Sequence, residues 1–169
     1  QAPVDVPTHV SEACNSALTM FEKLEELNTE LEQEAVNNNK EFRPLKIGIG
    51  LNTGSCCVGN MGSNQRFDYS ILGDDVNLCS RLEGQSKGYG VDIVISETTK
   101  IAAPEFATIE LDLIQVKGKT VPVRIFALIG NSEVQASEWF TDMSTIHAEL
   151  ILEYRSQNWK KAKTLASKA

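Results

Sequence analysis

Apolar positions in the first part of the chain follow a helical period. From Val10 to Leu31 they recur every three or four residues, and Glu, Asn and Lys fill the positions between them. This pattern predicts one long amphipathic helix. Thr8 stands where it can cap the first turn, and the asparagine run 37–39 ends the helix.

The apolar period changes to two over residues 45–51, which predicts a strand with one apolar face. The other face carries Gly48 and Gly50, so we expect another part of the chain to approach the backbone closely there. The Gly- and Asn-rich segment 54–64 has the composition of a loop, and residues 66–72 have that of a second strand. We therefore expect a β-hairpin with a long connection.

The pattern up to residue 130 continues as a helix over 74–87, a strand over 91–95, a short helix over 97–103 and two strands over 106–117 and 121–129. Asp74 or Asp75 can cap the first of these helices, and Ser96 can cap the second. The tight turn 118–120 joins the last two strands. The order of elements predicts an α+β fold, with helices on one face of a mostly antiparallel sheet.

The character of the chain changes after Gly130. Residues 134–157 and 159–168 have the pattern of a helical hairpin that resembles a single helical repeat. The pattern leaves three roles open: a hairpin packed on the preceding domain, a linker to further helices, or a surface that binds a partner. We expect two parts, a domain over 1–130 and a helical segment over 131–169.

Composition excludes several classes of protein. The 169 residues are 41% hydrophobic and 23% charged, as in a globular domain, and the net charge of −7 argues against a nucleic-acid binder. No apolar run reaches the roughly 18 residues of a membrane span. The chain opens on Gln1, so we expect a fragment of a longer protein. The four cysteines lack metal-ligand spacing. We expect Cys56 and Cys57 to be small buried side chains of the protein, which stay reduced in a reducing compartment.

The strongest candidate chemistry lies in the block 66–87. Asn77 and Arg81 stand four residues apart on a predicted helix, so they share one face. An amide and a guanidinium on one face suit an anionic, oxygen-rich ligand such as a nucleotide. The alternative is a structural role, in which Arg81 pairs with Glu83 or Asp75.

The sequence of this block resembles a known family. Residues Tyr69–Glu83 are similar to the Gly-Asp-x-Val-Asn-x-x-x-Arg-Leu-Glu motif of class III adenylate and guanylate cyclases. Residues 47–54, 58–63 and 116–119 also resemble that family, in the same order along the chain. The likeness covers about 1–130 and is greatest to the bacterial adenylate cyclase branch. It implies a partial ferredoxin-like cyclase domain followed by a helical segment.

The family's enzymes cyclise a nucleoside triphosphate. The resemblance implies the same reaction for this chain and suggests roles for individual residues. Asn77 would orient the ribose, and Arg81 would neutralise charge on the α-phosphate in the transition state. Lys117 would hold the terminal phosphates, with Lys119 as the second choice. Ser70 stands where the family reads the purine edge. Its hydroxyl is compatible with adenine, so we expect ATP in preference to GTP.

The resemblance also implies two divalent cations, Mg or Mn, in the intact domain. The family's metal carboxylates lie upstream of the position that Gln1 matches, so we expect no metal ligand in this chain. The adjacent Asp74 and Asp75 are therefore not assigned to a metal, and Asp74 is interpreted as a helix cap.

The family works as dimers with shared active sites, which implies a homodimer for the intact protein. We expect the fragment alone to be inactive, because only one half of each site is present. A cytoplasmic catalytic domain is expected, in a parent protein that a membrane anchor can tether. The alternatives are a non-catalytic cyclase-like module for nucleotide binding or dimerisation, and an interaction protein that uses 131–169.

Overall fold

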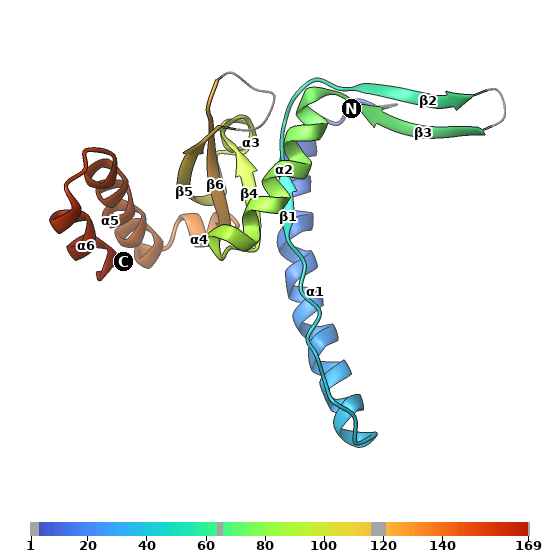
Figure 1. Cartoon of the computed structure of the whole chain (residues 1–169), viewed down its shortest axis with the longest axis horizontal. Coiled ribbons are helices and arrows are strands. Elements are labelled where there is room, and N and C mark those ends of the chain that lie inside the picture. The colour runs from blue at the N-terminus through green and yellow to red at the C-terminus, as the bar shows by residue number, and fades with distance from the viewer. Residues whose placement is uncertain (1–3, 64–65, 116–120, 169) are drawn as a thin grey trace.

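The computed structural model describes residues 4–63, 66–115 and 121–168 (Figure 1). The helices are α1 (His9–Asn37), α2 (Asp74–Tyr89), α3 (Glu97–Ala102), α4 (Ser132–Gln135), α5 (Glu138–Arg155) and α6 (Trp159–Ala166). The strands are β1 (Ile49–Leu51), β2 (Cys57–Ser63), β3 (Arg66–Leu72), β4 (Ile93–Ser96), β5 (Ala107–Ile114) and β6 (Val123–Gly130). The order of elements agrees with the predicted α+β class, except that β2 is additional. The predicted turn 118–120 lies outside the described residues.

The central sheet has the strand order β1-β4-β6-β5. Strand β1 runs parallel to β4, whereas β6 is antiparallel to both β4 and β5. The prediction of a mostly antiparallel sheet is therefore confirmed. Strands β2 and β3 form a separate antiparallel ribbon, which projects away from the central sheet in Figure 1.

The predicted pairing of the strand at 45–51 with that at 66–72 is wrong. The hairpin partner of β3 is β2, which occupies most of the segment expected to be a loop. Its Gly59, Asn60 and Gly62 have low β propensity, which concealed the strand in the sequence. Strand β1 instead pairs with β4, with Gly50 opposite Val94.

Helices cover both faces of the central sheet, not one face as predicted. Helix α1 packs Cys14 and its apolar neighbours against the face that carries Ile95. Helix α2 packs Leu82 against the opposite face, which carries Val94 and Ile125. The reason lies in β4, which is buried at every position and so requires apolar cover on both sides.

The helix starts show which side chains act as caps. The Oγ of Ser96 accepts a hydrogen bond from the Thr99 N–H, as predicted. The Thr8 hydroxyl instead donates to Glu12 Oε1 at 2.6 Å and caps no backbone N–H. The predicted role of Asp74 as a cap is also wrong. Gly73 is the N-cap of α2, and Asp74 is the first helical residue, where a carboxylate is favoured by the helix dipole.

The segment after Gly130 contains one more helix than predicted. Ser137 is extended and its hydroxyl accepts from the Phe140 N–H, which separates the short α4 from α5. Phe140 is 2% exposed and anchors the start of α5. At the other end of the helix, Tyr154 meets Trp159 of α6 in an edge-to-face ring contact.

The cysteines differ in their exposure. Cys14 is buried, and burial, followed by the charge of Glu105, raises its pKa to about 11. Cys56 and Cys57 are exposed, contrary to the expectation that they are buried. They stand at the base of the projecting β2–β3 ribbon, where apolar sequence does not lead to burial because the central sheet does not cover it.

Candidate functional site

Helix α2 carries the predicted site residues and lies directly on the backbone of β1. A Cβ atom added to Gly50 would stand 2.4 Å from the carbonyl oxygen of Cys79 and 2.4 Å from the amide nitrogen of Glu83. Only glycine allows this approach, so the predicted close contact at the glycine-bearing face is confirmed. The Cys79 thiol lies 3.0 Å from the Gly50 carbonyl oxygen and donates a hydrogen bond to it.

A polar bridge fixes the first turn of α2. The Asn52 Nδ2 donates to the carbonyl oxygen of Asp75 at 3.0 Å, and Thr98 Oγ1 donates to Asn52 Oδ1 at 3.2 Å. The end of β1 thereby connects the start of α2 to α3. The sequence analysis assigned Asn52 no role. The sequence feature that could have indicated a role is the position of this polar amide at the end of the alternating strand.

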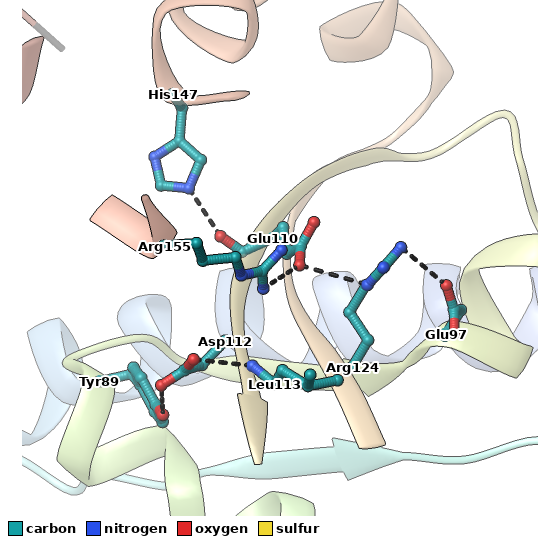
Figure 2. A network of polar contacts seen from close by, with 8 residues as sticks. All are labelled: Tyr89, Glu97, Glu110, Asp112, Leu113, Arg124, His147 and Arg155. Carbon is teal, nitrogen blue, oxygen red and sulfur yellow. Dashed lines mark hydrogen bonds and ion pairs between the residues drawn. The ribbon is translucent and has the colours of Figure 1, made fainter. Parts of the chain in front are cut away.

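The last turn of α2 is fixed as well. Gly90 adopts a left-handed conformation with φ of 67° and ends the helix, as glycine commonly does at this position. The Tyr89 hydroxyl donates to Asp112 Oδ2 on β5 at 2.9 Å (Figure 2). Partial burial, followed by this hydrogen bond and the Asp112 charge, raises the pKa of Tyr89 to about 12. Both ends of the helix are therefore held to the sheet.

Asn77 and Arg81 occupy one side of this fixed helix. They lie one turn apart, because four residues of α-helix rise about 6 Å. Asn77 is exposed and Arg81 is half-buried. Within residues 4–63, 66–115 and 121–168, neither side chain has a hydrogen-bond or ion-pair partner, so Arg81 pairs with neither Glu83 nor Asp75. Both side chains are available to a ligand.

The other predicted substrate-binding residues are placed differently. Ser70 is exposed on β3 and stands opposite Gly59 of β2. It is separated from α2 by Ile71, Leu72 and the capping Gly73. Lys117 and Lys119 lie outside the described residues. The structure therefore brings Asn77 and Arg81 together on α2 and places Ser70 on the ribbon that leads into that helix.

The described residues do not supply a metal site. Across those ranges, no three His, Cys, Asp or Glu side chains gather in a way that fits a metal ion. Asp74 and Asp75 stand adjacent at the start of α2, but without a third such ligand. We therefore assign no step to a metal held by this part of the chain.

Among the residues that the structure describes, no helix combines the length and apolarity needed to span a bilayer.

Comparison with known proteins identifies the family. The family model of the adenylate and guanylate cyclase catalytic domain matches residues 1–130. The chain belongs to this family of nucleotide cyclase catalytic domains, and the resemblance and fold class inferred from the sequence are confirmed.

Individual relatives are similar over most of the chain. Adenylate cyclase 1 of Rhizobium meliloti (strain 1021) is 32% identical over 130 residues, which are 76% of this chain and 19% of that protein. The chain thus spans about a fifth of that relative. Among solved structures, the guanylyl cyclase Cya2 is 32% identical, with a TM-score of 0.62 over 79% of this chain and 64% of the other. The guanylate cyclase domain of RhGC from Catenaria anguillulae, solved with GTP, is 30% identical. Its TM-score is 0.59 over 77% of this chain and 64% of the other.

Proposed function

We propose that this chain supplies one half of the active site of a cyclase that converts ATP to 3′,5′-cyclic AMP and pyrophosphate in intracellular signalling. The observation that carries the proposal is the pair Asn77 and Arg81. Both lie on one side of a helix that β1 and β5 hold in place, and neither has a partner in the described chain. A helix that served only for packing would not need an unpaired guanidinium on the side that carries Asn77.

The proposed reaction forms a bond from the ribose 3′-oxygen to the α-phosphorus and breaks the bond from that phosphorus to the β-phosphate oxygen. Pyrophosphate leaves. Arg81 binds the α-phosphate oxygens as negative charge increases in the transition state, which is where a fixed cation contributes most. Asn77 is a hydrogen-bond donor and acceptor that orients the ribose. The rigid seat of α2 on Gly50 keeps both groups in place before the substrate arrives.

Three further parts belong to the proposal. Ser70 reads the purine edge, and its hydroxyl can accept from the adenine amino group, which favours ATP. Lys117, with Lys119 as second choice, holds the terminal phosphates. In the intact protein, which by this proposal is a homodimer, the metal carboxylates of one subunit would complete the site that Asn77 and Arg81 of the other subunit form, and they would hold the two divalent cations. By this proposal the chain alone is inactive, and its natural setting is a cytoplasmic domain of a larger protein that a membrane anchor can tether.

A complementation assay tests the proposal. This chain is mixed with a cyclase domain that keeps the metal carboxylates but lacks the Asn/Arg pair, and product is measured with Mn²⁺ and either ATP or GTP. We expect cyclic AMP from the mixture and none from either component. Arg81→Ala should lower the rate by about 10²–10³-fold, the usual effect of removing one transition-state donor.

Arg43→Ala is the matched control, because Arg43 is an exposed arginine outside α2 and the sheet. It should leave the rate unchanged. A folded mixture that forms a mixed dimer without making product would contradict the proposal and favour a non-catalytic module. Product from GTP but not ATP would contradict the substrate assignment alone.

A further inference from the structure

A cavity lined by no residue of α2 lies where helix α5 meets the sheet. Its volume is about 360 Å³. Its walls come from both parts of the chain. Lys100 of α3, Glu110 of β5 and Phe126 of β6 form one side, and His147, Ile151 and Arg155 of α5 form the other. Figure 2 shows His147 and Arg155 directed from α5 toward Glu110.

The charged groups at the edge of this cavity are balanced. Glu110 accepts from Arg155 at 2.5 Å and lies 3.3 Å from the Arg124 Nε, while Arg124 reaches Glu97 at 3.1 Å (Figure 2). Two carboxylates therefore neutralise two guanidiniums. The His147 Nε2 lies 2.6 Å from the Glu110 carbonyl oxygen, which occupies that ring nitrogen. These contacts join α5 to β5 without filling the cavity.

Lys100 adds a positive charge that this network of carboxylates and guanidiniums does not neutralise. Its Nζ stands 4.2 Å from the centroid of the Phe126 ring. Among the residues that the structure describes, no carboxylate pairs with it. An ammonium held over an aromatic ring in a partly enclosed cavity attracts an anion, because neither the ring nor the balanced network neutralises it.

Most of the remaining lining is apolar. Ile109, Ile151 and Leu152 line it together with Phe126. Thr108 and Ser144 add hydroxyls, of which that of Ser144 already donates to the Thr141 carbonyl oxygen at 3.0 Å. A single unpaired cation suits the single charge of a carboxylate better than a phosphate, which requires more donors. The apolar walls suit a hydrocarbon body.

We propose that this cavity binds a small organic carboxylate with an apolar body, with its carboxylate at Lys100. Such a ligand contacts α3, β6 and α5 at once, so its binding strengthens the attachment of the C-terminal helices to the cyclase domain. The site is separate from Asn77 and Arg81, and the proposal stands independently of the reaction assigned to them.

The experiment uses the whole chain and two matched probes, octanoate and its uncharged counterpart octanamide. Binding is followed by amide chemical shifts in ¹⁵N-labelled protein. We expect octanoate to shift the amides of Ile109, Ser144 and Ile151 saturably, with about millimolar affinity for so small a probe. Octanamide should bind about tenfold more weakly, a difference equivalent to about 1.4 kcal/mol.

Variants of the lysine complete the test. Lys100→Met keeps the apolar stem and should weaken octanoate binding about tenfold without affecting octanamide, whereas Lys100→Arg should retain it. Lys163→Met removes an exposed lysine from α6 and is the control, with affinity unchanged. Equal affinity for the two probes would overturn the proposal. So would octanoate shifts that map elsewhere, or the absence of saturable shifts in the folded protein.

Discussion

The close packing of α2 on β1 can be tested by adding a single methyl group in a Gly-to-Ala substitution. In Gly50→Ala, the added Cβ would stand 2.4 Å from Cys79 O and Glu83 N, both of which belong to the helix backbone. A backbone atom cannot turn aside as a side chain can. Ordinary contact begins at 3.4 Å, so α2 must retreat by about 1 Å, the difference between 3.4 and 2.4 Å.

The loss of stability depends on which contacts of α2 are separated when the helix moves away from β1. Leu78 and Leu82 of α2 pack against Val94 and Ile125, and a gap of 0.5–1 Å removes about a quarter to a half of the dispersion attraction at such contacts. Overpacking of this kind costs about 1–3 kcal/mol. Replacing glycine with alanine also lowers the conformational entropy of the unfolded chain, which offsets up to about 1 kcal/mol of this loss. We therefore expect the free energy of unfolding to fall by about 1–2 kcal/mol.

Urea unfolding followed by circular dichroism measures this loss. Gly48→Ala should cost less, because its Cβ would meet only side-chain atoms of Ser86, the hydroxyl at 2.3 Å and Cβ at 3.2 Å, and no backbone atom closer than 3.5 Å. Gly84→Ala is the control in the same helix. Its Cβ meets nothing within 4 Å, so the higher helix propensity of alanine should stabilise by up to about 1 kcal/mol. If Gly50→Ala unfolds like the wild type, the helix does not rest on this strand as described.

Two further predictions concern the cysteines and the C-terminal helices. The exposed Cys56 and Cys57 should react with a thiol reagent at pH 8 in the folded chain, whereas Cys14, with a pKa of about 11, should react only on unfolding. Because that pKa is raised from 9.0 by folding, its stabilisation is present below pH 9 and is lost as pH rises from 9 to 11; equal labelling rates would disprove the burial of Cys14. Phe140→Ala should cost about 3–5 kcal/mol of local stability, because the ring is 2% exposed at the start of α5. Hydrogen exchange should show the loss in α5 while β4 stays protected, since Phe140 lies outside the core clusters of the sheet; equal loss in β4 would show that the two parts unfold together.

The local pattern of the chain determined most of its elements. Helical periodicity was sufficient for α1 and α2, and the cap at Ser96 was evident from its position. The two glycines of the 45–51 segment indicated a close backbone approach, and α2 makes it. The shared face of Asn77 and Arg81 also followed from spacing. These features depend on residues within a turn or two of each other, which is the range over which sequence period acts.

The tertiary structure decided the features that depend on distant residues. Strand β1 pairs with β4 and not with β3, and the Asn52 side chain directly after β1 finds its partners on α2 and α3. Cys56 and Cys57 remain exposed because the ribbon beside them leaves the sheet. An alternating strand contains no information about which strand lies beside it or which face is covered. Those choices are made when segments far apart in the chain compete to bury the same apolar surface.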